Sequence, residues 1–126
     1  MSRPEIIYLR ASDAETLGRL IQGAEDGRDA AGAALLDEEL SRAKIVPDDA
    51  LPPQTVALDS RVRFQEETTG RVREVTLVVP WKVSPEDGRI SVLSPVGSAL
   101  IGLTVHDDID WPLPGGKMRL RVLEVA

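Results

Sequence analysis

The sequence contains no cysteine, a single histidine and only four aromatic residues in a chain of 126. The absence of cysteine excludes disulfides and thiolate metal sites, and it is typical of a reducing compartment. With so few aromatic rings, the core must consist of Val, Leu, Ile and Ala, and a ligand pocket lined by aromatic side chains is not expected. No run approaches the roughly 20 apolar residues that span a bilayer, and the N-terminus lacks the apolar stretch of a signal peptide. We therefore expect a soluble, cytoplasmic protein without a membrane contact.

A basic surface is also lacking. The net charge is −6, with six basic and nine acidic residues in 1–46 and nine basic and twelve acidic residues in 47–126. Proteins that bind nucleic acid neutralise its phosphates with clustered Lys and Arg, so direct nucleic-acid binding is not expected here. An acidic chain without a basic run is more consistent with a protein partner.

The first 46 residues carry helical periodicity on both sides of a loop. Apolar residues recur three or four positions apart over 14–21 and again over 33–43, and Gly23 and Gly27 interrupt the pattern between them. The second stretch must end before Pro47, because proline disfavours a helical residue ahead of it. The pattern predicts an antiparallel helical hairpin with arms of about 12 residues, which gives a projection about 20 Å long.

Two shorter signals precede the first helix. Residues 5–9 form a β-prone run, and Ser12 with Glu15 matches a capping box, in which each side chain bonds to the backbone of the other residue. We therefore expect the first helix to begin at Ser12.

The hydrophobic period changes after a segment rich in proline. Residues 47–53 hold three prolines and two acids, which is typical of a stiff, exposed linker. Beyond them, runs such as 61–64, 75–79 and 118–122 alternate apolar with other residues and are separated by glycine-containing turns, as expected of antiparallel strands. A short helix is expected over the apolar run that follows Pro95.

These patterns predict an α+β protein with a hairpin unit at 1–46, a linker at 47–53 and an antiparallel sheet domain with one short helix at 54–126. Within the sheet, Val72 has the opposite parity to Val75, which predicts a β-bulge near Arg73-Glu74. The arginines of the strands are expected on an outer, solvated face together with acids; they are Arg61, Arg63, Arg71, Arg73, Arg119 and Arg121.

The last two thirds of the chain resemble the C-terminal domain of the Gre transcript-cleavage factors of bacterial RNA polymerase. The shared pattern is an I-S-x-x-S-P run, an A-L-x-G helix, an acid-bearing turn and a final P-G-G. It is carried here by Ile90, Ser91, Ser94, Pro95, Ala99, Leu100, Gly102, Asp107, Pro114, Gly115 and Gly116. The complete chain is similar to the Rnk branch of this family, the regulators of nucleoside diphosphate kinase.

This resemblance implies an FKBP-like C-terminal domain, an N-terminal coiled-coil finger and docking at the rim of the polymerase secondary channel. It places the contact with polymerase at the loop formed by Ser94, Pro95 and Val96. One position departs from the pattern, because Gre factors usually have Gly-Asp where this chain has His106-Asp107. The resemblance implies neither a cofactor nor an oligomer, and we expect a monomer.

Three acidic residues, Glu25, Asp26 and Asp29, lie at the tip of the predicted hairpin. In Gre factors, acids at the tip of a long coiled coil help to hold a second Mg²⁺ in the polymerase active centre, and carboxylates are suitable ligands for that ion. A projection of about 20 Å is too short for this delivery. We expect instead that Asp29 caps the second helix and that the tip holds negative charge at the channel mouth, with no catalytic residue and no resident metal.

Other candidate sites are weaker. His106 has no nucleophile near it in the sequence, so it is expected to be a turn residue and not a catalytic base. Asp107, Asp108 and Asp110 lack the glycine and glutamate of a calcium-binding loop, so they too are expected in a turn. The sequence therefore favours a non-enzymatic regulator that competes with Gre factors at RNA polymerase. The alternatives are a true cleavage stimulator and a prolyl isomerase, which would need Phe64, Trp81 and Trp111 to line a pocket.

Overall fold

A computed structural model of the chain describes residues 6–24, 27, 29–113 and 116–126, with only the main chain described at 111–113, 117 and 118. The helices are α1 (Ala11–Gly23), α2 (Ala30–Arg42) and α3 (Pro95–Leu100), with short 3₁₀ helices at Asp48–Ala50, Pro80–Lys82 and Pro85–Asp87. The strands are β1 (Tyr8–Arg10), β2 (Lys44–Val46), β3 (Arg61–Glu66), β4 (Arg71–Val78), β5 (Arg89–Ser91), β6 (Asp108–Leu113) and β7 (Gly116–Val125).

The predicted α+β architecture is confirmed, but the sheet is mixed. Its strand order is β5-β4-β3-β7-β6, and β5 runs parallel to β4 while the other pairs are antiparallel. A parallel neighbour requires a crossover, and residues 79–88 supply it through two 3₁₀ helices. The expectation of a purely antiparallel sheet was therefore wrong. A second sheet, which the sequence did not predict, pairs β1 with β2 in parallel at the base of the hairpin.

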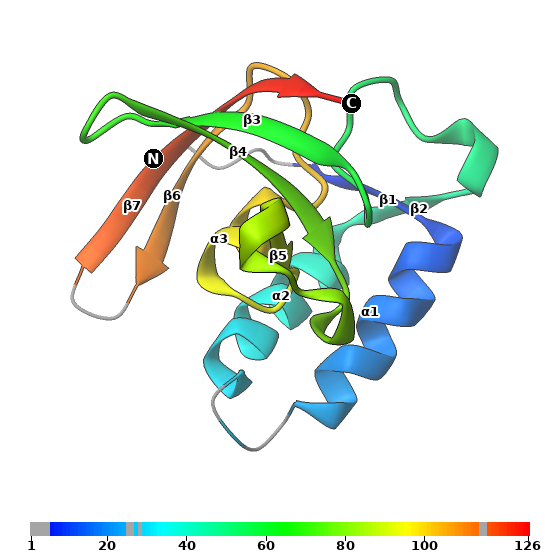
Figure 1. The fold of residues 1–126 in the computed structure, drawn as a ribbon. Helices are drawn as coiled ribbons and strands as arrows, with labels where there is room; N and C mark the ends of the chain where they lie inside the picture. Colours follow the sequence, from blue (N-terminus) through cyan, green and yellow to red (C-terminus); the bar gives the residue numbers. More distant parts are fainter. Residues whose placement is uncertain (1–5, 25–26, 28, 114–115) are drawn as a thin grey trace.

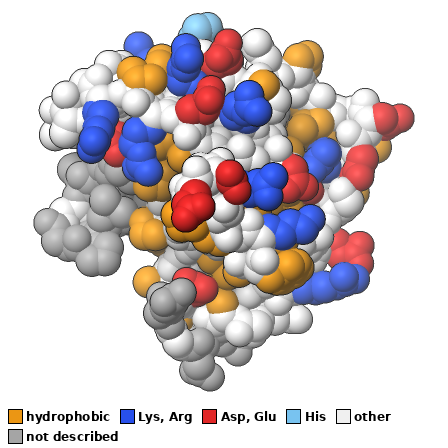
Figure 2. All heavy atoms as spheres, viewed as in Figure 1, with side chains coloured by type: hydrophobic (Ala, Val, Ile, Leu, Met, Phe, Trp, Pro, Cys, Tyr) orange, Lys and Arg blue, Asp and Glu red, His pale blue; other side chains and the backbone are white. Residues whose placement is uncertain are grey.

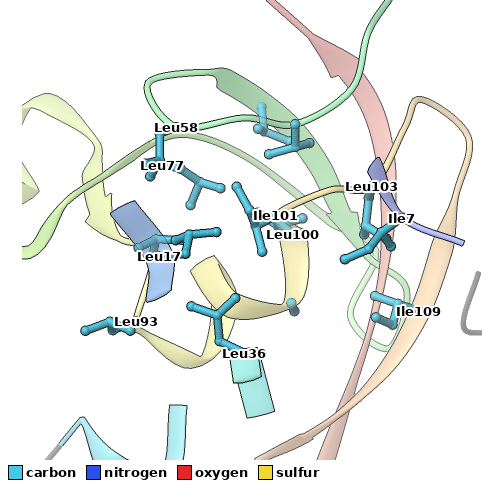
Figure 3. Close-up of a cluster of buried hydrophobic side chains, with 14 of the residues drawn as sticks. Ile7, Leu17, Leu36, Leu58, Leu77, Leu93, Leu100, Ile101, Leu103 and Ile109 are labelled. Carbon is cyan, nitrogen blue, oxygen red and sulfur yellow. The ribbon is translucent and has the colours of Figure 1, made fainter. Parts of the chain in front are cut away.

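The helical hairpin is present, and it lies against the rest of the molecule. Figure 1 shows a curved sheet above α3, with α1 and α2 below α3. Leu17 from α1 and Leu36 from α2 point toward α3 and are fully buried in one hydrophobic cluster with residues of the sheet (Figure 3). The hairpin and the sheet domain therefore share a core, and the inner faces of the two arms are occupied.

A very close approach joins the hairpin to the sheet domain. Gly32 of α2 lies under the main chain of Leu93, so that a Cβ atom at Gly32 would be 2.1 Å from the Leu93 carbonyl oxygen. No side chain fits between these two backbones. The glycine is thus a requirement of the packing between α2 and the loop that precedes α3.

The start of α1 differs from the predicted capping box. The helix begins at Ala11, and the side chain of Arg10, the residue ahead of it, makes no capping hydrogen bond. Ser12 lies inside the helix and donates its backbone N–H to Oδ1 of Asp48 at 3.0 Å, whereas Glu15 pairs with Arg19 one turn further on. Hydrogen bonds from the Ser12 hydroxyl and backbone lower the pKa of the exposed Asp48 carboxyl. At a pH above the ordinary pKa of an aspartate, the interaction between Ser12 and Asp48 stabilises the fold. This stabilisation is lost as the pH falls through the lowered pKa of Asp48.

A buried carboxylate joins the two halves of the chain. Asp13 is 4% exposed and accepts two hydrogen bonds from the Arg10 guanidinium, both at 2.9 Å. It also accepts the backbone N–H of Leu58 at 3.2 Å, while Nη2 of Arg10 donates to the Leu58 carbonyl at 3.2 Å. The hydrogen bond with Asp13 raises the pKa of Arg10. The pair thus connects the start of α1 to the segment that leads into β3.

The bulge expected near Arg73-Glu74 is absent, because β3 and β4 pair without interruption over the whole of β3. Val72 is on the outer face and 51% exposed. Arg73, directly opposite Phe64, lies on the inner face at the rim, with its guanidinium 5.7 Å from the centre of the Phe64 ring. An arginine stem can cover an apolar ring and keep its charge in water, so Val72 need not turn inward. The register shift occurs elsewhere, between β3 and β7 at Arg63 and Phe64.

We expect Thr55→Val to raise the free energy of unfolding by about 1 kcal/mol. Thr55 is buried, and within the described part of the chain its hydroxyl is the buried side-chain group that has no hydrogen-bond partner. Burying an unpaired hydroxyl is unfavourable, and valine has the same shape without it. Urea denaturation of the wild type, Thr55→Val and Thr55→Ala would measure this. A valine variant no more stable than the wild type would show that the hydroxyl is satisfied in solution.

Candidate protein-docking surface

The residues that the sequence singled out for docking lie at the start of α3. Ser94 precedes the helix and its hydroxyl accepts the N–H of Gly97 at 3.0 Å, while it donates to the Ser91 carbonyl at 2.6 Å. Pro95 occupies the first helical position, where a missing N–H costs nothing. Pro95 is exposed and Val96 is half-buried against the core. The serine therefore fixes the loop, and of these three residues the proline is the one that is exposed.

A surface groove with a volume of about 500 Å³ opens beside this loop. Four segments meet there: the crossover between β4 and β5, β5 itself, the start of α3, and the residue ahead of α2. Its walls are mainly apolar, and the residues that line it are Asp29, Pro80, Val83, Pro85, Arg89, Ile90, Ser91, Ser94 and Pro95. Because its described lining is mainly apolar, the groove suits the binding of apolar side chains.

A second hollow of about 310 Å³ lies on the other side of Pro80. It is bounded by the C-terminal end of α1, by Leu93 and by Trp81, and it shares Asp29 and Pro80 with the first. Trp81 is 73% exposed, which is unusual for a tryptophan in a chain with so few aromatic residues. The sequence analysis did not identify this surface, although a tryptophan between a proline and a lysine was its one visible signal.

Of the three acids predicted at the hairpin tip, only Asp29 can be placed, because Glu25 and Asp26 lie outside the described residues. Asp29 directly precedes α2, and its carbonyl accepts the N–H of Ala33 at 2.9 Å. Its side chain makes no cap hydrogen bond, so the predicted capping role of this carboxylate was wrong. Among the described residues, no three His, Asp or Glu side chains gather closely enough to hold a metal ion.

The three acids near the start of β6 each have a structural partner. Oδ2 of Asp107 accepts the backbone N–H of Thr104 at 2.8 Å and its hydroxyl at 3.0 Å, which closes the turn. Asp108 pairs with Arg121 at 3.3 Å, and Asp110 pairs with Arg119 at 3.6 Å. Asp107 thus lies in a turn as predicted, whereas Asp108 and Asp110 lie in β6, where they form part of a mixed charged face with the arginines of β7.

His106 adopts the backbone conformation that glycine favours, with φ of +75°. The turn therefore keeps the shape that Gly-Asp would give it. We expect His106→Gly to be about 1 kcal/mol more stable than His106→Ala, because the left-handed conformation is unfavourable for a residue with a Cβ atom. Thermal or urea unfolding of the two variants would measure the difference. Equal stabilities would contradict the strained turn.

Phe64 and Trp81, two of the three residues that a prolyl isomerase pocket would need, have opposite environments. Phe64 is completely buried in the core, whereas Trp81 is on the surface. The side chain of the third, Trp111, lies outside the described residues. Within the described segments, no helix is long and apolar enough to cross a membrane.

Two family models together cover nearly the whole chain. The model described as "Transcription elongation factor, GreA/GreB, C-term" matches residues 51–126, and the model described as "Rnk N-terminus" matches residues 6–46. The first contains all of the sheet domain and α3, and the second contains the hairpin with both strands at its base.

Individual relatives agree with this division. The regulator of nucleoside diphosphate kinase of Escherichia coli (strain K12) is 43% identical over 127 residues, which cover 99% of this chain and 91% of that protein. Transcription elongation factor GreA of Bacillus licheniformis is 32% identical over 91 residues, or 72% of this chain and 58% of the relative.

A solved structure extends the likeness to the fold. The prokaryotic transcription elongation factor GreA/GreB from Nitrosomonas europaea has 39% sequence identity and a TM-score of 0.75, with 98% of this chain and 99% of that chain covered. The chain therefore belongs to the family of Gre-like proteins in which an Rnk N-terminus precedes a GreA/GreB C-terminal domain.

Proposed function

We propose that this protein is a non-enzymatic transcription regulator. It binds bacterial RNA polymerase at the rim of the secondary channel, competes there with Gre factors and does not stimulate transcript cleavage. The observation that carries the proposal is the combination of a GreA/GreB C-terminal domain over residues 51–126 with helical arms of only 13 residues each. In this proposal the sheet domain is the FKBP-like docking unit, and the hairpin is a shortened form of the Gre finger.

The short arms separate docking from cleavage. An arm of 13 residues is about 20 Å long, and the inner faces of both arms are packed against α3. The acidic tip of such a hairpin stays near the channel mouth, where Glu25, Asp26 and Asp29 place negative charge. That charge disfavours the entry of other acidic fingers and of nucleotides. Mg²⁺ delivery to the active centre would require a longer arm.

The direct test is binding to core RNA polymerase in competition with a Gre factor. Labelled protein is titrated with polymerase, and unlabelled GreA is then added to the complex at fixed salt. We expect saturable binding that GreA displaces. Absence of binding, or a complex that GreA cannot displace, would contradict the proposal. Serum albumin labelled in the same way controls for non-specific association.

A cleavage assay distinguishes this proposal from the Gre-type alternative. Backtracked elongation complexes are incubated with this protein, with GreA, or with both. We expect no stimulation by this protein alone and a reduced rate with both, because the two compete for one site. Stimulation by this protein alone would establish it as a cleavage factor and overturn the proposal.

The printed name of the Escherichia coli relative refers to nucleoside diphosphate kinase. We propose that an influence of the present protein on that kinase is indirect and acts through transcription. Deletion of its gene is then expected to change the kinase messenger RNA and the kinase protein in parallel. An unchanged messenger level, together with direct binding of the two purified proteins, would contradict this route.

A further inference from the structure

The two hollows beside Pro80 are neighbours, because they share part of their lining. One lies between the β4–β5 crossover and the start of α3, and the other lies between the crossover and the end of α1. In the view of Figure 2, apolar side chains lie between acidic and basic ones over the region of β5 and the segment before it. Pro80 and Asp29 line both hollows, so a segment that fills one of them lies next to the other.

The apolar part of this surface is exposed in the free protein. Trp81 is 73% exposed and Val83 is 43% exposed, and Pro85 is also at the surface. Large apolar side chains that gather beside a groove are typical of contact sites, and an exposed tryptophan is the residue type that most often dominates a binding energy.

The charge at the centre of the surface is negative. The Asp29 carboxylate is half-buried in the wall that the two hollows share, and it has neither a hydrogen bond nor an ion pair within the described residues. Each of the two arginines lines one hollow only: Arg89 lines the first, and Arg19, which is paired with Glu15, lines the second. A complementary ligand therefore has a positive centre with apolar groups on each side.

We propose that this surface receives one segment of the polymerase, which inserts apolar side chains on either side of Pro80 and places a single Lys or Arg at the Asp29 carboxylate. The inference rests on the proposed function, since it takes RNA polymerase as the partner. In this proposal the hairpin contributes to binding through Asp29, and this contribution does not require long helical arms. Asp29 belongs to the hairpin and Trp81 belongs to the sheet domain, so both parts of the chain contribute to one site.

The test compares the affinity of full-length variants for core RNA polymerase. We expect Trp81→Ala to weaken binding about tenfold or more, as is typical of an aromatic anchor. Asp29→Asn removes the charge and keeps a residue suited to the start of a helix; it should weaken binding about fivefold, and Asp29→Lys should weaken it further. The matched controls are Val72→Ala on the outer sheet face and Asp37→Asn on the exposed side of α2, and neither should change affinity. Thermal unfolding confirms that each variant is folded.

A photo-crosslinking residue in place of Val83 identifies the bound segment. We expect the captured polymerase peptide to contain a Lys or Arg between apolar residues, and capture of an acidic peptide would overturn the proposal. If the wild type and the Trp81 and Asp29 variants bind equally well, the docking surface is wrong while the proposed function stands. If the wild type does not bind polymerase at all, both are wrong.

Discussion

Gly32→Ala is expected to lower the free energy of unfolding by about 2–3 kcal/mol, although alanine is the better helix former. The added Cβ would lie 2.1 Å from the Leu93 carbonyl oxygen, so α2 and the loop before α3 must move apart. Moving either segment is unfavourable, because the obstructing atom belongs to the main chain and both α2 and the loop carry buried residues. Overpacking of this kind typically costs 1–3 kcal/mol and sometimes more.

Gly18→Ala is the matched control, because Gly18 lies in α1 with no atom within 4 Å of the position a Cβ would take. The same substitution there should stabilise the protein by about 0.5–1 kcal/mol through helix propensity alone. Urea denaturation of both variants measures the two changes in the free energy of unfolding, which should have opposite signs. A Gly32 variant as stable as the wild type would mean that the hairpin is not seated on the loop before α3 in solution.

Asp13→Ala is expected to cost about 3 kcal/mol. The substitution removes the carboxylate that pairs with Arg10 and accepts the Leu58 N–H, and it leaves a part-buried guanidinium and a backbone donor without that acceptor. Removing one partner of a buried pair is strongly destabilising for this reason. Asp13→Asn keeps an acceptor for Leu58 and should fall between the alanine variant and the wild type.

Glu15→Ala provides the comparison on the same helix. Glu15 also pairs with an arginine, Arg19, but both side chains are largely exposed, and such pairs contribute little. We expect a change of less than about 0.5 kcal/mol. Guanidinium denaturation would show the contrast, and equal losses for Asp13→Ala and Glu15→Ala would refute the role assigned to the buried pair.

The parts of the fold that follow from local periodicity were predictable from the sequence. The α3 helix begins at Pro95 with Ser94 ahead of it, and Val62, Phe64, Leu120 and Val122 are buried as their alternation indicated. The glycine of the A-L-x-G motif acquires a physical reason only in the structure. Gly102 has φ of +83°, and a Cβ there would be 2.9 Å from Cβ of Ile7.

Several of the errors have a physical cause that a local pattern does not show. The Ser12 and Glu15 pattern fits a capping box, but Asp48 takes the Ser12 N–H and Arg19 takes the Glu15 carboxylate. Val72 suggested a bulge because its side chain was expected to face inward. Arg73 takes the inner position instead and lies over the Phe64 ring. The parallel strands β1, β2 and β5 have three residues each. The β-prone run at 5–9 overlaps β1, but β2 and β5 are too short for a pattern to appear.

The candidate site was predictable only in part. The motif located Ser94 and Pro95, which line the first groove. The remainder of the surface combines the crossover after β4, the end of α1 and the residue before α2. Those segments are far apart in the sequence, and only the packing of the hairpin under α3 brings Asp29 to Pro80 and Trp81.

The parallel pairing of β1 with β2 has a consequence for how such proteins can diverge. The two strands hold both ends of the hairpin together at its base, so the chain between them is anchored independently of its length. Whole helical turns could be added at the distal end of both arms without disturbing this anchor. Such turns would move Asp29, but they would leave in place the residues of the sheet domain that line the groove beside α3. The reach of the arm can therefore change while the base of the hairpin and the sheet domain stay the same.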